Sequence, residues 1–294
     1  MKDDSMLTSL SIIVPAYNEA RRLGKSLQTI LQYMDEHVRD GELIVVDDGS
    51  KDNTTQVAEE AFASIQHEVP ARVIRNTPNR GKGHAVRTGL LAARGNTALF
   101  SDADLSTPIT ETPKLVLPIE QGTYDVVFGS RAIDRSLIGV HQPWQREQSG
   151  RVFNLAVKLA TRMPFWDTQC GFKAFRMNVC RPLVEAAVID RFGFDVELLY
   201  IAHLAGLRLC EQAVRWDDYE GSTVSFLGGL HGFTELRTLR QQAKRGMYDK
   251  AINAARRAAT EHEGTKRVSN RNDEAFAHDA AAAAPELTGS TQRL

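Results

Sequence analysis

The sequence predicts an α/β protein with a mostly parallel sheet covered by helices on both faces. Three observations carry this prediction. Short apolar runs rich in β-branched residues recur along the first half of the chain, stretches with helical spacing separate them, and polar residues directly follow several of the runs. This alternation is typical of a parallel sheet, because neighbouring parallel strands need a crossover connection, which is usually a helix.

Six runs are predicted strands because they are short, apolar and bounded by polar or glycine residues. The predicted strands are residues 11–14, 43–46, 71–74, 98–100, 125–128 and 207–216. The last of these alternates apolar and polar residues, whereas the others are mostly apolar.

Helix signals lie between and after these strands. A helix is predicted to begin at Asn18-Glu19, a second after Asn53 as its cap, and a third where the loop at Gly81 continues toward Arg94. Thr107-Pro108 predicts a further helix start with proline in the first turn. A last helix is predicted from apolar residues at helical spacing, namely Leu236, Leu239, Ala243, Met247, Ala251 and Ala254.

The domain organisation is predicted from composition. The 294 residues are 42% hydrophobic, which is enough for a buried core, and no linker interrupts the first part of the chain. We therefore expect one α/β domain over 1–230, a basic C-terminal helix over 231–263, and a disordered tail over 264–294, where the composition becomes polar.

Bulk properties narrow the class of protein. The net charge of −1 gives no indication of nucleic-acid binding, and the three cysteines lack metal-ligand spacing. No apolar run approaches the roughly 18 to 20 residues of a membrane span, and the N-terminus lacks the pattern of a signal peptide. The expected location is cytoplasmic, with possible peripheral contact at the cytoplasmic face of the membrane.

Polar side chains follow three predicted strands. Residues 17–19 come after the first strand, Asp47-Asp48 after the second, and Asp102-Ala103-Asp104 after the fourth. In open α/β sheets, ligands bind in the crevice at the carboxyl ends of the strands. We therefore expect these side chains to meet in one crevice.

Asp102 and Asp104 are the predicted chemical centre. Mg²⁺ prefers one or two carboxylates together with substrate phosphates, and a metal on a diphosphate neutralises charge on a leaving group. An isolated Asp-x-Asp is common, and a polar turn before the helix at Thr107 is the alternative.

Residues 79–83 place two glycines around Lys82, which permits close backbone approach to phosphates. The loop is not a Walker A fingerprint, because Asn76 stands where its first glycine belongs and Gly83 follows the lysine. Val86 occupies the third glycine position of a dinucleotide fingerprint, which argues against a dinucleotide-dependent oxidoreductase. An ordinary loop before a helix is the alternative.

Four further groups are candidates for chemistry. Arg131, at the end of the fifth strand, suits a phosphate held by two parallel hydrogen bonds, with a surface salt bridge as the alternative. Lys173 also suits a phosphate. Asp195 and Glu197 precede an apolar helix, where they suit a base or an acceptor contact, or simply the helix dipole.

Six segments in order resemble glycosyltransferase family 2, and within it the synthases of polyprenyl-phosphate sugars, especially the dolichyl-phosphate glucosyltransferases. The segments are residues 13–19, 46–54, 79–83, 102–104, 129–131 and 169–173. The resemblance implies a GT-A fold and an inverting transfer that requires Mg²⁺ or Mn²⁺.

The resemblance also implies roles for individual residues. Those implied to bind the nucleotide are Pro15, Tyr17, Glu19, Asp48, Lys82 and Asp102, and the metal would be held by Asp102 and Asp104. The implied catalytic residues are Asp104, Arg131, Lys173 and Asp195, with the arginine and lysine near the acceptor phosphate.

Two acceptors remain open. One is a polyprenyl phosphate, which is already anionic, with UDP-glucose favoured over GDP-mannose as the nucleotide-sugar donor. The other is a soluble hydroxyl, which needs a general base, with Asp195 first and Glu197 and Asp167 behind it. A catalytically inactive nucleotide-sugar binding module is disfavoured, because the candidate catalytic residues are intact.

Membrane contact has its own sequence signal. The predicted helix from Leu236 to Ala258 carries seven lysines and arginines against one acidic residue, and an apolar stretch at 226–233 precedes it. Basic residues beside an apolar edge suit anionic lipid. A helix packed on the catalytic domain with a solvated basic face is the alternative.

Overall fold

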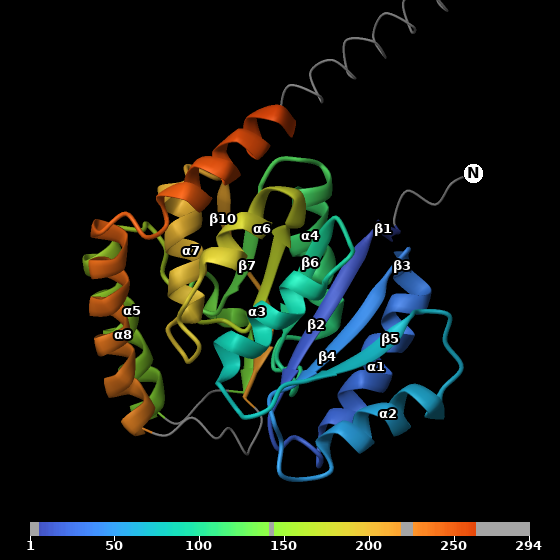
Figure 1. Ribbon diagram of the computed structural model, residues 1–294. Helices are drawn as coiled ribbons and strands as arrows, with labels where there is room; N and C mark the ends of the chain where they lie inside the picture. The colour runs from blue at the N-terminus through green and yellow to red at the C-terminus, as the bar shows by residue number, and fades with distance from the viewer. Residues whose placement is uncertain (1–5, 141–143, 219–225, 263–294) are drawn as a thin grey trace, which may run out of the picture. The chain divides into compact units, whose positions relative to one another are not determined.

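The computed structural model describes residues 6–140, 144–218 and 226–262 (Figure 1). The chain forms two compact units, Met1–Arg256 and Arg257–Leu294. All labelled elements below belong to the first unit. The tail predicted to be disordered over 264–294 lies outside the described residues.

The first unit is built on a sheet with strand order β10-β7-β9-β6-β2-β4-β5. All neighbours are parallel except β9, which is antiparallel to both β6 and β7. The strands are β2 (Leu10–Ala16), β4 (Glu42–Asp47), β5 (Ala71–Arg75), β6 (Thr97–Ser101), β7 (Val126–Ser130), β9 (Phe172–Arg176) and β10 (Leu209–Ala213). Two small parallel pairs lie apart from it, β1 (Leu7–Thr8) with β3 (Val38–Arg39) and β8 (Ile138–Val140) with β11 (Trp216–Asp217).

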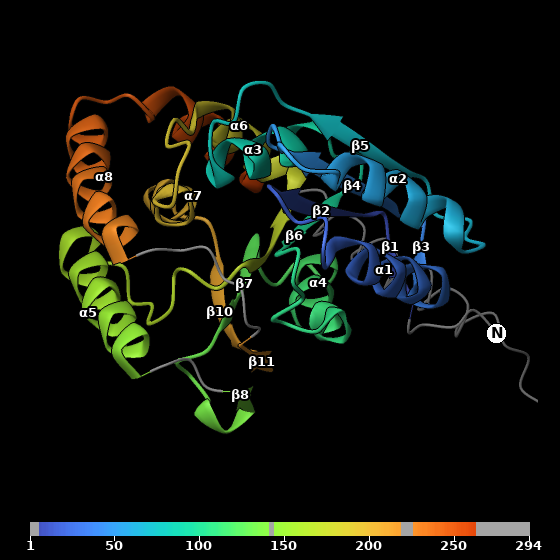
Figure 2. The same ribbon diagram turned by 90° about the horizontal axis from the view of Figure 1, so that it is seen from below.

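Helices cover both faces of this sheet. One face carries α1, α2 and α4, and the other carries α3, α6 and α7 (Figure 2). The bounds are α1 (Leu23–His37), α2 (Thr54–Ser64), α3 (Lys82–Ala92), α4 (Thr112–Glu120), α5 (Trp144–Thr161), α6 (Met177–Ala186), α7 (Phe194–Leu204) and α8 (Phe226–Lys244), with short 3₁₀ helices η1 (Ile109–Glu111) and η2 (Arg135–Leu137). The predicted α/β architecture is confirmed.

The core forms because β2 and β4 are mostly apolar and are buried along their whole length. Ile12, Val14, Leu43 and Val45 are fully buried against the apolar face of α1. On the other face α3 approaches closely at Gly89, where a Cβ would lie 2.3 Å from Ile13 Cγ2. Strands buried on both sides need such continuous apolar runs, which is why the sequence pattern located them.

One central strand was missed in the sequence. Residues 172–176 form β9, and all of them are buried. The segment contains Lys173 and Arg176, so it carries charges where a buried strand normally has apolar residues. The sequence pattern did not predict this strand, because Lys173 and Arg176 interrupt its apolar residues and the partners of these charges are distant in sequence.

Two helix starts differ from the sequence prediction, whereas the start after Asn53 is confirmed although its side chain makes no capping bond. Helix α1 begins at Leu23 rather than Asn18-Glu19, after a turn in which the Leu23 amide donates to Glu19 O (3.0 Å). Asn53 precedes α2 without a side-chain capping bond, because Asp52 Oδ1 accepts from the Thr54 amide (3.0 Å) instead. Residues 107–108 lead into η1, and α4 starts only at Thr112.

The basic C-terminal helix predicted over 231–263 is interrupted. Helix α8 ends at Lys244, a turn follows, and the chain is helical again from 249 to 262. Gly246 in this turn has φ = +73°, a left-handed conformation that glycine adopts without steric cost and that ends helices. Tyr248 anchors the turn, because its hydroxyl donates to buried Glu197 Oε1 (2.6 Å). None of the described helices is long and apolar enough to span a membrane.

Candidate active site

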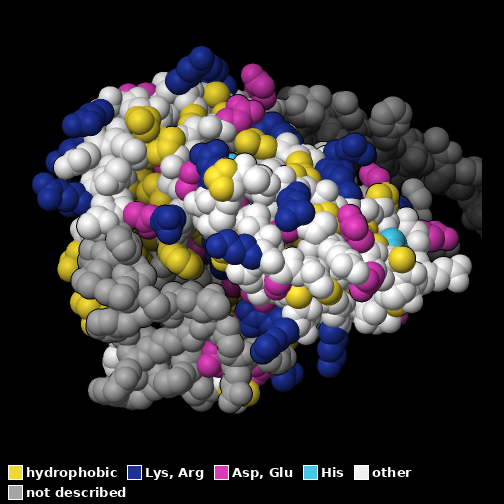
Figure 3. Space-filling model, turned by 60° about the horizontal axis from the view of Figure 1, so that its bottom comes forward, with side chains coloured by type: hydrophobic (Ala, Val, Ile, Leu, Met, Phe, Trp, Pro, Cys, Tyr) yellow, Lys and Arg dark blue, Asp and Glu magenta, His cyan; other side chains and the backbone are white. Residues whose placement is uncertain are grey.

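The candidate site lies at the carboxyl ends of β6, β2 and β4. These strands are neighbours in the sheet, so the polar segments that follow them meet at one edge, at the bottom of Figure 1. Figure 3 turns this end forward and shows acidic and basic side chains mixed over it. The predicted convergence of three strand ends is therefore present.

Asp102 and Asp104 lie beside two cations. Lys82 Nζ is 2.6 Å from Asp102 Oδ1, and Arg22 Nη1 is 3.6 Å from Asp104 Oδ2. Burial alone would lower the pKa of Lys82, but the charge of Asp102, with those of Asp195 and Asp104, raises it. The site thus combines two carboxylates with two permanent positive charges.

Gly171 fixes the position of the Asp102 carboxylate. The Asp102 amide donates to Gly171 O (3.0 Å), and a Cβ at position 171 would lie 2.0 Å from Asp102 Oδ2. Only glycine leaves room for the carboxylate at this close approach.

Replacing Gly171 by alanine is expected to displace Asp102 while leaving the fold intact. A displacement approaching 1 Å in a catalytic site can cost up to about 10²-fold, and we expect kcat to fall at least about tenfold. Gly150→Ala is the matched control, because nothing lies within 4 Å of a Cβ built there. Unchanged kcat in Gly171→Ala would contradict the role of this contact.

Asp48 shapes the loop that carries Lys82. Its Oδ2 accepts the amides of Arg80 (3.0 Å) and Gly81 (2.6 Å), and its Oδ1 accepts from Asn76 Nδ2 (3.1 Å). The carboxylate predicted to contact the nucleoside is thus bound to the lysine loop.

The other side of this loop packs on Asp190. The His84 amide donates to Asp190 O (3.1 Å), and a Cβ on Gly81, whose φ is +119°, would lie 2.5 Å from that oxygen. The Asp190 carboxylate accepts from Arg80 Nη2 (2.8 Å) and Arg87 Nη2 (2.6 Å). The loop that carries Lys82 is therefore held between Asp48 and Asp190.

Residues 17–19 and 50–54 lock together beside the site. The Asn18 amide donates to Ser50 Oγ (2.9 Å), and the Glu19 amide donates to Thr54 Oγ1 (2.8 Å). Pro15 is buried at the end of β2, whereas Tyr17 is 41% exposed. The Glu19 carboxylate binds the Arg22 guanidinium.

Arg131 is held by Asp167 through a bidentate pair. The bonds are 2.7 Å from Nε to Oδ2 and 2.8 Å from Nη2 to Oδ1, and the Arg131 amide also donates to Oδ2 (3.0 Å). Burial alone would raise the pKa of Asp167, but the charge and hydrogen bonds of Arg131 lower it to about 2. The guanidinium is therefore fixed in orientation rather than free at the surface.

The Arg131–Asp167 pair is expected to make the free energy of unfolding sensitive to acid. The pKa of Asp167 is depressed from 3.8 to about 2, so its contribution is complete above about pH 4 and is lost as pH falls toward 2. The contribution is about 2 kcal/mol of unfolding free energy. Urea unfolding between pH 6 and 3 should show a steeper acid loss in the wild-type protein than in Asp167→Asn. Equal slopes would contradict this coupling.

Lys173 and Asp195 form a buried ion pair behind the site. Lys173 is fully buried, Asp195 is 5% exposed, and Nζ lies 2.5 Å from Asp195 Oδ1 and donates to Cys170 O (2.5 Å). Burial raises the pKa of Asp195, although the charges of Lys173 and Lys82 oppose this. Of the predicted catalytic residues, these two are therefore the least accessible to a ligand.

Arg22 and Asp190 were not among the site residues predicted from sequence. Arg22 stands three residues after Glu19, a spacing that favours pairing in a helical turn and could have been noticed. Asp190 gave no signal, because its partners Arg80 and Arg87 are more than 100 positions away. Glu197, a secondary candidate base, instead accepts the amides of Val188 (2.9 Å) and Ile189 (2.8 Å).

The carboxylates of Asp102 and Asp104 suit a divalent cation that also binds phosphate groups of a substrate. The described residues contain no cluster of three or more histidine, cysteine or acidic ligands that would hold a metal by themselves. Asp102 and Asp104 supply two carboxylates, and Mg²⁺ usually takes its other ligands from phosphates and water. The residues present are thus compatible with a metal that binds together with a diphosphate.

Comparison with known proteins identifies the family of the chain. Residues 11–183 match the model of glycosyl transferase family 2. The dolichyl-phosphate beta-glucosyltransferase of Drosophila melanogaster is 37% identical over 234 residues, covering 76% of this chain and 71% of that protein. The human protein of the same name is 35% identical over 234 residues, covering 74% and 70%.

A solved structure supports the fold. Glucosyl-3-phosphoglycerate synthase from Mycobacterium tuberculosis, in complex with uridine diphosphate, superposes with a TM-score of 0.57 at 21% identity, over 79% of this chain and 80% of that one. The expected GT-A fold is confirmed. Because the family model spans more than half of the chain and includes the segments that carry Lys82, Asp102 and Asp104, this protein is a glycosyltransferase and belongs to glycosyl transferase family 2.

Proposed function

We propose that this glycosyltransferase moves glucose from UDP-glucose to a polyprenyl phosphate such as dolichyl phosphate. The observation that carries the proposal is that three motif segments far apart in sequence, 79–83, 102–104 and 169–173, meet at Asp102, with Arg22 beside Asp104. Relatives named for dolichyl-phosphate glucosyl transfer, similar over more than two thirds of their length, support the choice of sugar and acceptor.

The reaction is an inverting displacement. An oxygen of the acceptor phosphate attacks the anomeric carbon of glucose, the bond from that carbon to the diphosphate oxygen breaks, and its electron pair leaves with uridine diphosphate. A phosphate monoester is largely ionised at neutral pH, so the acceptor needs no general base. The protein must align the two anions and screen their repulsion.

The donor is assigned to the carboxylate pair and the loops around it. Asp102 and Asp104 would hold Mg²⁺ or Mn²⁺, which supplies charge neutralisation on the leaving diphosphate. Lys82 and Arg22 add fixed positive charge at the same place. Pro15, Tyr17 and Glu19 are proposed to surround the nucleoside, with Asp48 acting through the lysine loop that it binds.

The acceptor phosphate is assigned to Arg131. Its guanidinium is oriented by Asp167, which leaves one of its two terminal nitrogens, Nη1, without a bond to that carboxylate. Lys173 is proposed to act through Asp195 rather than by direct contact, because it is fully buried. A soluble hydroxyl acceptor would require an accessible base, and the burial of Asp195 in an ion pair favours the phosphate acceptor instead.

A transfer assay tests the proposal. Purified protein receives labelled UDP-glucose, Mg²⁺ or Mn²⁺ and a polyprenyl phosphate, with and without chelator. Label should move to the organic phase and stop with chelator. Transfer only to a water-soluble saccharide would contradict the acceptor, and transfer from GDP-mannose alone would contradict the donor. The proposed site of action is the cytoplasmic face of a membrane.

A further inference from the structure

Helix α5 presents an apolar stripe to solvent. Val152, Leu155 and Leu159 are 61%, 56% and 74% exposed, and their spacing places them on one side of the helix. The opposite side is the buried one, with Phe153, Val157 and Thr161 facing the interior. A surface helix normally shows the reverse arrangement, with polar residues outward, so this stripe requires an explanation.

Trp166 extends the apolar surface just beyond the end of α5. It is 60% exposed, and Lys158 Nζ lies 3.4 Å from the centre of its ring. An exposed tryptophan covered by a lysine combines an apolar body with a charge, a combination suited to the boundary between lipid and water.

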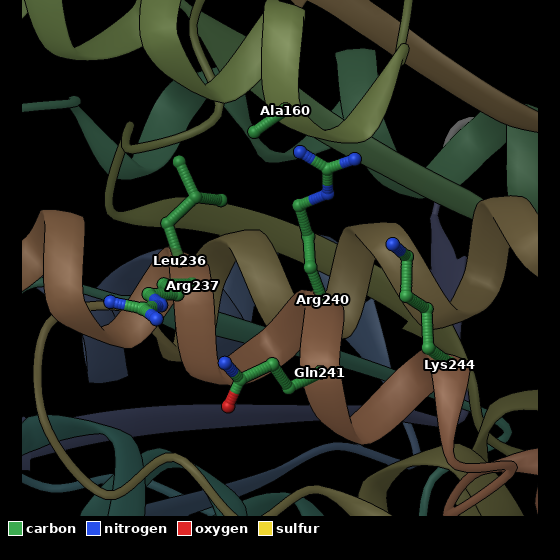
Figure 4. A pocket seen from close by; sticks show the side chains of 6 residues that line it. All are labelled: Ala160, Leu236, Arg237, Arg240, Gln241 and Lys244. Atoms are coloured by element: carbon green, nitrogen blue, oxygen red, sulfur yellow. The ribbon is translucent and has the colours of Figure 1, made fainter.

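Basic residues border the stripe. Helix α8 lies beside α5 in both ribbon views, and the two enclose a pocket of about 330 Å³ (Figures 1 and 2). Figure 4 shows Arg240 and Lys244 pointing from α8 toward α5, where Ala160 is next in sequence to Leu159. The edge of the molecule on this side carries several lysine and arginine side chains (Figure 3).

Negative charge is scarce on this surface. Among the described side chains of α5 and α8, Glu235 is the one acidic residue, and its carboxylate accepts a hydrogen bond from the Gly193 amide (2.8 Å). The described side chains of this surface therefore combine an outward apolar stripe, an exposed tryptophan and mostly positive charge. An anionic lipid bilayer is complementary to all three.

We propose that the outer face of α5, with the basic row of α8, docks this protein on an anionic lipid bilayer. The stripe, comprising Val152, Leu155 and Leu159, enters the headgroup region, while Lys158 and the row at Arg240 and Lys244 contact lipid phosphates. Membrane docking by this surface does not depend on which acceptor the enzyme uses, but its biological purpose rests on the proposed function. Docking would bring the site to an acceptor whose hydrocarbon chain stays in the membrane.

Vesicle binding tests the proposal. The full chain is sedimented with phosphatidylcholine vesicles, with or without phosphatidylglycerol, and without polyprenyl phosphate. Binding should require the anionic lipid and weaken with salt. Leu155→Asp with Leu159→Asp should lower the partition coefficient by at least about tenfold, because two apolar side chains no longer enter the lipid. Arg240→Gln and Lys244→Gln should each lower it by roughly fivefold.

Controls separate docking from folding and from catalysis. Val188→Asp changes an exposed valine outside both helices and should leave vesicle binding unchanged. The melting temperature of the Leu155→Asp, Leu159→Asp variant should match the wild type, because both side chains are exposed. This variant should also keep its turnover with a short, water-soluble isoprenyl phosphate and lose it with a long-chain acceptor in vesicles.

Three outcomes would overturn the proposal: no binding of the wild type to anionic vesicles, equal binding of the stripe variant, or a concentration-dependent dimer that the stripe substitutions abolish while vesicle binding is absent. The last would assign the stripe to a second copy of the chain. If the protein binds vesicles but transfers glucose to no polyprenyl phosphate, the proposed function is contradicted and the proposed docking surface is not.

Discussion

Replacing Asp104 by alanine is expected to lower kcat by roughly 10²-fold or more, with little change in stability. Asp104 stands at the carboxyl end of the sheet beside Arg22, and it is one of the two carboxylates assigned to the metal. Removing one group that stabilises developing charge in a preorganised site typically costs on this scale. Without it, the remaining carboxylate of Asp102 should also bind Mn²⁺ more weakly.

The measurement is steady-state transfer at several metal concentrations, with metal affinity followed separately by calorimetry. Asp134→Ala is the matched control, because this aspartate precedes the short helix η2 as its N-cap and its Oδ1 accepts from the amide and hydroxyl of Ser136. The control should stay within about twofold of the wild type, as surface substitutions usually do. Wild-type rates and metal affinity in Asp104→Ala would remove the metal assignment.

Replacing Asp195 by asparagine is expected to destabilise the protein by about 3 to 5 kcal/mol. The substitution leaves the Lys173 ammonium fully buried without its counter-charge, and breaking a buried pair on one side is far costlier than breaking a surface pair. Lys114→Met, which breaks the exposed pair with Glu111, should cost no more than about 1 kcal/mol. Urea unfolding of both variants measures the difference.

The same variant discriminates between the two acceptors. If Asp195 is held by Lys173 and does not abstract a proton, the folded fraction of Asp195→Asn should retain the acid limb of the pH–rate profile. If it is a general base for a hydroxyl acceptor, that limb should disappear and kcat should fall by about 10² to 10⁴. A stability loss below about 1 kcal/mol would contradict the buried pair itself.

The motif residues were located from sequence because their spacing is local. Asp102 and Asp104 directly follow a strand, and residues 79–83 directly precede a helix. Short apolar runs at residues 11–14 and 43–46 identified two of the parallel strands, since both faces of those strands are buried. The family resemblance depended on the order of these same local segments.

Pairings across the chain were not accessible in this way. Arg131 was expected at a phosphate, and the structure adds that Asp167, 36 positions later, holds it. Lys173 was expected at a phosphate too, but it lies in β9, a buried strand with no apolar pattern, facing Asp195. Each of these charges has a partner that only the folded sheet brings within hydrogen-bond distance.

By itself, then, the sequence determined the class of fold, the carboxylate pair and the lysine loop, because strand patterns, turns and phosphate-binding loops depend on neighbouring residues. The tertiary structure alone decided which charges are free to meet a ligand and which are already paired. It also decided that the apolar side chains of α5 face outward, since the same helical spacing in a sequence suits a buried face and an exposed one equally.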